Sequence, residues 1–166
     1  MTVLTALELK FGDGDYLFDL KLPQLAELQR LRDCGIFKIY GRVRKGRYLL
    51  GDGIVDIPED GEAFVEDLYE TIRLGLVGGG KGMVNGKEVE VSAIRARQLV
   101  ETYVHPAPLR ECWMIAVAIL GARVEGYSPP KDEPAKAPAT AKRKTKRSTS
   151  RRSSPTAPSS AATGDS

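Results

Sequence analysis

The chain has 166 residues, of which 42% are hydrophobic, and a formal net charge of +3. This length suits a single domain and is too short for two domains of ordinary size. Residues 128–166 carry nine Lys and Arg against three acids, whereas residues 1–127 carry sixteen basic and nineteen acidic side chains, so the excess positive charge does not indicate a nucleic-acid-binding fold.

The first predicted elements are a β-hairpin and a helix. Apolar and polar side chains alternate over residues 7–11 and 16–22, on either side of a Gly/Asp-rich turn. Alternation with a period of two around a turn predicts a hairpin. Pro23 suits the first position of a helix, and Gly35 suits the left-handed residue that follows one. Leucines recur between them at helical spacing, so we expect a helix over residues 23–34.

Residues 36–59 have a weaker pattern. Glycines and basic residues interrupt short apolar runs, which predicts a loop or a second short hairpin. An almost continuous apolar cluster opens this stretch, formed by Ile36, Phe37, Ile39 and Tyr40. Two interpretations of the cluster are open: it forms a buried strand, or it is an exposed patch that binds a partner protein.

The second half of the domain is mostly helical by pattern. Apolar side chains at intervals of four predict a helix from about Asp60 to the glycines at 78–80. The Asn-Gly pair within residues 84–91 predicts a small hairpin or an extended loop. Ser92 is a suitable N-cap for a helix that stops before Pro106.

The last predicted helix begins near Pro108. Apolar residues nearly encircle it, so we expect it to be the central element of the core. The elements together predict an α+β fold that is mainly helical, with an N-terminal β-hairpin followed by about four helices, and then a disordered basic C-terminal tail.

That tail is expected from composition. Residues 128–166 contain no Val, Ile, Leu, Met, Phe, Trp, Tyr or Cys, and such a segment cannot bury enough surface to offset its ordering entropy. We therefore expect a folded domain over residues 1–127 and a disordered Pro/Ala/Ser/Lys/Arg-rich tail over residues 128–166. The basic run at residues 142–147 supports either nonspecific nucleic-acid contact or a solvated, partner-binding tail.

No catalytic arrangement is recognisable in the sequence. Gly75 to Gly82 resembles a phosphate-binding loop, but Gly82 stands where the magnesium-ligating Ser or Thr belongs. A helix precedes these glycines where a buried strand should, so a helix stop is the better interpretation. His105 is the single histidine, and Cys34 and Cys112 form no CxxC pair. We therefore predict that the protein is not an enzyme and has no cofactor or metal site.

Membrane insertion and secretion are also not indicated. The first residues lack a basic region followed by an apolar run, and the longest apolar stretch, residues 113–120, is far shorter than the ~20 residues that a spanning helix needs. The sequence predicts a cytoplasmic protein without a membrane partner.

Four blocks of the chain resemble the gene transfer agent tail family, small proteins from the tail modules of gene transfer agents and related prophages of alphaproteobacteria. In chain order, the blocks are residues 22–28 with Cys34-Gly35, residues 71–80, Leu99-Val100 with Tyr103-Val104, and Pro108-Leu109 leading into residues 116–122. Members of the family are described as tail assembly chaperones or as tail tube proteins. The expanded loop at residues 41–59 and the C-terminal tail lie outside the resemblance.

The resemblance implies a non-enzymatic role in phage-like tail morphogenesis in the bacterial cytoplasm, with association to a virion left open. Because most of the predicted elements are helices, the resemblance favours a tail assembly chaperone that binds the tape measure protein and other tail proteins. The alternatives are a structural tail tube subunit that self-associates, and a nonspecific nucleic-acid-associated protein acting through its basic tail. The candidate partner-binding residues are Ile36, Phe37, Ile39 and Tyr40.

Overall fold

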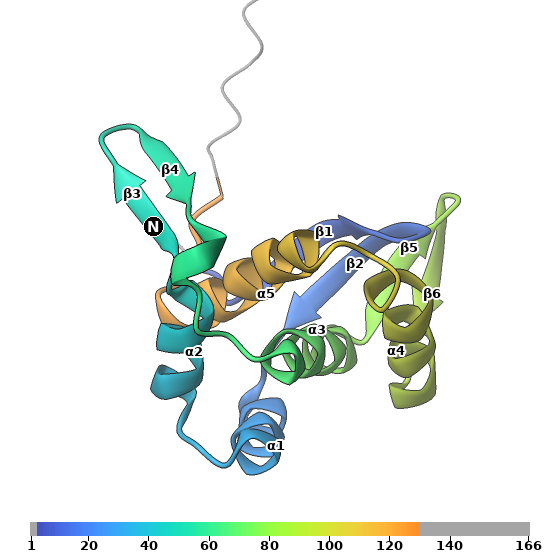
Figure 1. Cartoon of the computed structure of the whole chain (residues 1–166). Helices are drawn as coiled ribbons and strands as arrows, with labels where there is room; N and C mark the ends of the chain where they lie inside the picture. Colours follow the sequence, from blue (N-terminus) through green and yellow to red (C-terminus); the bar gives the residue numbers. More distant parts are fainter. Residues whose placement is uncertain (1–2, 130–166) are drawn as a thin grey trace, which may run out of the picture. The chain divides into compact units, whose positions relative to one another are not determined.

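The computed structural model describes residues 3–129, which form one compact unit (Figure 1). The tail predicted for residues 128–166 lies outside these residues from position 130 onward. The elements in chain order are β1 (Ala6–Phe11), β2 (Gly14–Asp19), α1 (Leu22–Arg32), α2 (Ile36–Arg44), β3 (Arg47–Leu50), β4 (Gly53–Asp56), the short 3₁₀ turn η1 (Pro58–Asp60), α3 (Val65–Gly79), β5 (Lys81–Val84), β6 (Lys87–Glu90), α4 (Ala93–Leu99), the π-helical segment η2 (Val100–Val104) and α5 (Leu109–Val124).

The main sheet is antiparallel, with the strand order β1-β2-β5-β6. The pairs Leu7↔Phe18 and Leu9↔Tyr16 set the register of the first hairpin and place apolar side chains on one face. Helices α3 and α5 pack against this face (Figure 1), while the alternate positions of β1 and β2 point the other way. The sheet therefore has one covered face, as is common for antiparallel sheets.

The predicted α+β class and its N-terminal hairpin are confirmed, and residues 3–129 contain five α-helices rather than about four. The additional helix is α2, so the strand considered for residues 36–40 is wrong. Its buried side chains are Ile39, Tyr40 and Val43, a helical spacing. The apolar pattern of residues 36–40 does not distinguish a strand from a helix, because α2 has only nine residues and short apolar runs fit both structures.

The hairpin alternatives are both confirmed as hairpins. Strands β3 and β4 pair around Gly51-Asp52, and β5 and β6 pair around Asn85-Gly86. The helix expected from about Asp60 begins later, at Val65, because residues 58–60 form a separate 3₁₀ turn. Ser92 caps α4 as predicted, since its hydroxyl accepts a hydrogen bond from the backbone N–H of Arg95 (3.2 Å).

The glycines at the end of α3 are explained by packing. A Cβ at Gly78 would clash with the backbone carbonyl of Asp19, and a Cβ at Gly79 would clash with that of Leu17. Gly80 then ends the helix in the left-handed conformation, with φ of 69°. The helix-stop interpretation is therefore confirmed, and these glycines also let α3 lie directly against strand β2.

Helix α5 is central in the core, as expected. It packs against α3, α2 and the first hairpin (Figure 1). Its indole donor, Trp113 Nε1, gives a hydrogen bond to the carbonyl of Val43 at the end of α2, so the one polar atom of this buried ring is satisfied. The buried residues of α5 are Cys112, Trp113, Ala116, Val117, Ile119, Leu120 and Ala122.

Candidate functional site

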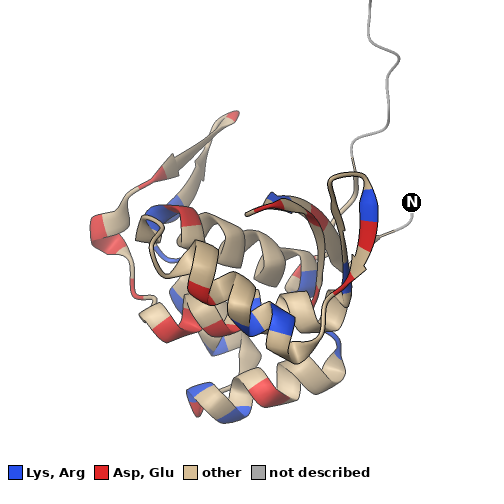
Figure 2. Ribbon diagram, turned by 90° about the vertical axis from the view of Figure 1, so that its right-hand side faces the viewer, with Lys and Arg blue, Asp and Glu red and all other residues tan. Residues whose placement is uncertain are grey.

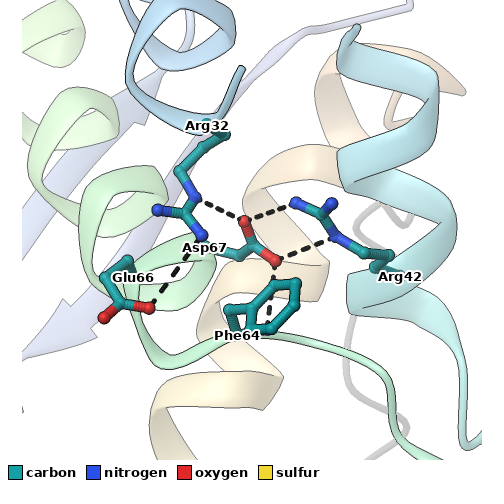
Figure 3. Close-up of polar contacts among 5 residues, drawn as sticks. All are labelled: Arg32, Arg42, Phe64, Glu66 and Asp67. Carbon is teal, nitrogen blue, oxygen red and sulfur yellow. Dashed lines mark hydrogen bonds and ion pairs between the residues drawn. The ribbon is translucent and has the colours of Figure 1, made fainter. Parts of the chain in front are cut away.

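A buried carboxylate joins three helices. Asp67, in the first turn of α3, is fully buried, and its Oδ1 accepts hydrogen bonds from Arg32 Nε (2.7 Å) and Arg42 Nη2 (2.8 Å) (Figure 3). Its Oδ2 accepts from Arg42 Nε (3.1 Å) and from the backbone N–H of Phe64 (3.1 Å). The ring of Phe64 lies near both guanidinium groups, with centroid distances of 5.9 and 5.1 Å. The carboxylate is therefore paired on all sides, as a buried charge requires.

This ion cluster fixes the base of the β3–β4 hairpin. Arg42 belongs to α2, which runs directly into β3, and Phe64 ends the loop that follows β4. The hairpin is closed at its base by the Arg47–Asp56 ion pair (3.2 Å), and Tyr48 donates a hydrogen bond to Asp60 of η1 (3.0 Å). Asp67 thus anchors both chain segments from which the hairpin extends.

The β3–β4 hairpin exposes apolar side chains on both of its faces. The cross-strand pairs Leu49↔Ile54 and Tyr48↔Val55 lie on opposite faces, and all four side chains are exposed; Leu49 reaches 74%. The hairpin projects from the body of the domain (Figure 1). A two-stranded hairpin of this kind is marginally stable by itself, and its apolar faces are typical of a surface that binds another protein.

A groove of about 500 Å³ lies beside the hairpin. It is lined by Leu49 and Ile54 of the hairpin, Leu9 of β1, and Ala118 and Gly121 of α5. Strand β1 is an edge of the described four-stranded sheet, and a free edge can pair with a further strand. The groove and the hairpin together form a candidate surface for an extended, apolar protein segment.

The structure separates the four residues predicted to bind a partner. Ile39 and Tyr40 are buried in the core, Ile36 is half-buried against it, and Phe37 is 76% exposed. They do not form one exposed patch, because helix α2 turns them to different sides. Of the four, Phe37 alone has an exposed side chain that a partner protein could contact.

Sequence reasoning missed the hairpin surface. The pattern of residues 36–59 predicts a loop or a second short hairpin, because glycines and charges interrupt the apolar runs, but it does not predict an exposed apolar surface. A signal was present: both strands carry apolar side chains at consecutive positions, Leu49-Leu50 and Ile54-Val55. A strand with one buried face should alternate instead, so such pairs in a short hairpin indicate a surface with no partner within the domain.

The cysteines, the histidine and the acidic groups of the described residues are the side chains from which a metal or thiol site would be built. Within residues 3–129, no three His, Cys, Asp or Glu side chains are arranged to hold a metal ion. Burial raises the pKa of the Cys112 thiol, and its Sγ lies 3.5 Å from the carbonyl of Val104, so the reactive thiolate is disfavoured. The ring of His105 contacts that of Tyr69 in a tilted arrangement, with a centroid distance of 5.0 Å and an interplanar angle of 41°.

The resemblance of Gly75–Gly82 to a phosphate-binding loop has no structural counterpart. Lys81 lies in strand β5, after a helix and before a hairpin turn, so no helix N-terminus faces a phosphate. A Cβ at Gly82 would clash with the ring of Tyr16, which leaves no room for a ligating Ser or Thr.

We expect the Lys81→Ala variant to keep the fold and the melting temperature of the parent protein, because Lys81 is exposed. Neither protein should bind ATP in isothermal titration calorimetry. Saturable ATP binding by the parent protein that disappeared in Lys81→Ala would contradict this expectation.

Comparisons with protein-family models, curated proteins and solved structures give no match to this chain. None of the helices within residues 3–129 has both the length and the apolar character needed to cross a bilayer. The features of this domain that bear on function are therefore the exposed β3–β4 hairpin and the groove beside it.

Proposed function

We propose that the protein is a non-enzymatic, cytoplasmic component of phage-like (gene transfer agent) tail morphogenesis. In this proposal it acts as a tail assembly chaperone that binds the tape measure protein. The observation that supports it is the β3–β4 hairpin, whose apolar side chains are exposed on both faces. A chaperone needs an apolar surface that covers its client reversibly and is small enough not to aggregate.

The hairpin surface suits weak, repeated binding. It is short, with four residues in each strand, and its tip carries Asp52, a charge that opposes aggregation through the hairpin. Several chaperone molecules bound along one long client would keep its apolar segments covered, although each contact is weak. Such binding leaves each site free to be released when tail subunits assemble around the client.

A structural tail tube subunit is the second candidate. The predominance of helices argues against it, but two observations favour it: β1 is an edge of the described four-stranded sheet, and the β3–β4 hairpin lines the same groove as β1. A hairpin from one subunit that joined the sheet edge of another would form a repeating, head-to-tail contact. Tube formation by the purified protein would favour this candidate.

Co-expression with the tape measure protein tests the chaperone proposal. The parent protein should increase the soluble fraction of the client severalfold, and Leu49→Asp/Ile54→Asp should lose most of this effect, because two charges replace the apolar face of the hairpin. Ile94→Asp is the control, since Ile94 is equally exposed (73%) but lies on α4. It should keep the effect of the parent protein.

Two outcomes would contradict the proposal. The client could be equally soluble without the protein, in which case no chaperone is needed. Alternatively, the purified protein could polymerise into tubes unaided, seen by negative-stain electron microscopy, and the tube subunit would then replace the chaperone. Circular dichroism should show that each variant is folded before either result is interpreted.

A further inference from the structure

One exposed face of helix α2 is basic and carries a large apolar side chain. The helix contains no acidic residue. Its period of 3.6 residues groups four positions of the helix on the side opposite the buried Ile39 and Val43, and Lys45 follows them at the C-cap. We call them the α2 face, which consists of Phe37, Lys38, Gly41, Arg44 and Lys45.

The charges of the α2 face are mostly free. Arg44 contacts Glu125 (3.0 Å), whereas neither Lys38 nor Lys45 has an acidic partner within 4.0 Å among residues 3–129. Phe37 is the most exposed of the large apolar side chains in that part of the chain. The face therefore offers one aromatic ring beside two unpaired cations.

A second surface lies beside an acidic segment of the chain. A groove of about 200 Å³ lies between the loop around η1 and the N-termini of α3 and α5. We call it the acidic groove; its lining includes Pro58, Gly61, Ala63, Val65, Leu109 and Trp113. It is smaller than the ~300–1,000 Å³ of typical small-molecule pockets, and its apolar lining suits a single inserted side chain.

No acid lines this groove itself, but Glu59, Asp60 and Glu62 are chain neighbours of the lining residues Pro58, Gly61 and Ala63. Residues 48–72 contain eight Asp and Glu and no Lys or Arg, and Figure 2 shows this stretch as red segments from the tip of the β3–β4 hairpin through η1 to the start of α3. Among them, Glu59, Asp60 and Glu62 have no Lys or Arg within 4.0 Å in the described part of the chain. Arg110 also lines the groove, but it lies 3.8 Å from Asp56.

We propose that the protein self-associates by placing the α2 face of one copy on the acidic groove of another. Phe37 enters the apolar groove, and Lys38 and Lys45 face Glu59 and Glu62. Both halves of the interaction lie on one chain and are complementary in charge and in apolar content. This inference concerns a surface other than the hairpin and does not depend on the chaperone proposal.

Other occupants of the groove fit less well. Residues 130–166 are basic but contain no apolar side chain larger than Pro, so they cannot fill an apolar groove. The β3–β4 hairpin of a second copy is apolar, but Asp52 and Asp56 would bring acids to an acidic surface. The α2 face supplies both the ring and the cations that the groove requires.

The contact should be weak and sensitive to salt. A single aromatic side chain buries ~150–250 Å², well below the ~1,200 Å² of a stable interface, so we expect a Kd on the order of 100 μM. Exposed charge pairs are screened by salt. Sedimentation equilibrium of the full chain should show self-association in 50 mM NaCl, and at least fivefold weaker association in 500 mM NaCl.

Variants on either surface should weaken self-association at least tenfold. These are Phe37→Ala and Lys38→Glu/Lys45→Glu on the α2 face, and Glu59→Lys/Glu62→Lys on the acidic groove. All the replaced side chains are exposed, so the fold should persist, as thermal melts would verify. The control is Glu88→Lys/Glu90→Lys, which makes the same charge change on exposed positions of β6 and should leave self-association within twofold of the parent.

Mixing provides the decisive measurement. The Lys38→Glu/Lys45→Glu variant keeps an intact groove, and the Glu59→Lys/Glu62→Lys variant keeps an intact α2 face. Two copies of the same variant, however, lack one half of the contact. Because the α2-face variant carries glutamates and its groove is still acidic, it should not pair with itself. A mixture of the Phe37→Ala variant with the groove variant retains one complete pair of surfaces and should form a one-to-one heterodimer with near-parent affinity.

Three results would overturn the proposal. The parent chain could remain monomeric at about 1 mM protein, roughly ten times the expected Kd. It could associate while no variant weakens the association, which would place the interface elsewhere. Finally, the groove variant could weaken association while the α2-face variants do not, and another basic segment, such as residues 130–166, would then be the occupant.

Discussion

Replacement of Gly79 by alanine is expected to destabilise the domain by about 3 kcal/mol or more, the upper range of the cost of overpacking a core. For a domain of this size the melting temperature should fall by roughly 10 °C. The Cβ of alanine at this position would clash with the backbone carbonyl oxygen of Leu17 in β2. A backbone atom cannot rotate away, so α3 and the sheet must separate.

The same substitution elsewhere should have the opposite sign. Gly41 lies within α2, and a Cβ there meets no atom within 4 Å. Gly41→Ala should therefore stabilise the protein by about 0.5–1 kcal/mol, the usual preference of a helix for alanine over glycine. Thermal and urea unfolding of both variants measure the difference. If Gly79→Ala melted within 2 °C of the parent, the close contact between α3 and β2 would not exist in solution.

Replacement of Asp67 by asparagine should also cost about 3 kcal/mol, because removal of one partner from a buried ion pair leaves the remaining charges uncompensated. Arg32 and Arg42 would lose the carboxylate that both contact, and asparagine can offer only one acceptor oxygen in its place. The amide also lacks the negative charge that is favourable in the first turn of α3. Urea unfolding should show a lower transition midpoint with an unchanged slope.

The control for this variant is the neighbouring acid. Glu66 is exposed, and its carboxylate lies 3.9 Å from Arg32 (Figure 3), so Glu66→Gln should change the stability by less than about 0.5 kcal/mol. Equal effects of the two substitutions would mean that burial of Asp67 does not determine its importance. Hydrogen exchange should further show that Asp67→Asn increases opening of α2 and of the hairpin base, which this carboxylate anchors.

Much of the fold of residues 3–129 could be predicted from local patterns. The first hairpin, the end of α3 at the glycines, the cap at Ser92 and the central position of α5 all follow from periodicity, turn residues and capping preferences. These features depend on a few neighbouring residues, so the sequence carries them directly. In the sequence, the glycines at positions 78–80 indicate the end of a helix. Their role in packing α3 against β2 becomes visible only in the structure.

The tertiary structure decided what local patterns leave open. Helix α2 is stabilised by contacts with residues distant in the chain, through Arg42 with Asp67 and Val43 with Trp113, and nine residues are too few for helical periodicity to indicate this. The same packing decides that Ile39 and Tyr40 are buried while Phe37 is exposed.

The candidate surfaces likewise combine features that the sequence determines with features that only folding decides. Composition alone determined that residues 1–127 contain all of the large apolar side chains and that the C-terminal segment carries the excess positive charge. Which apolar side chains remain exposed on the hairpin, and which acids lie beside the groove, was decided only by folding. Exposure depends on how distant segments cover one another, and a pattern of neighbouring residues does not contain that information.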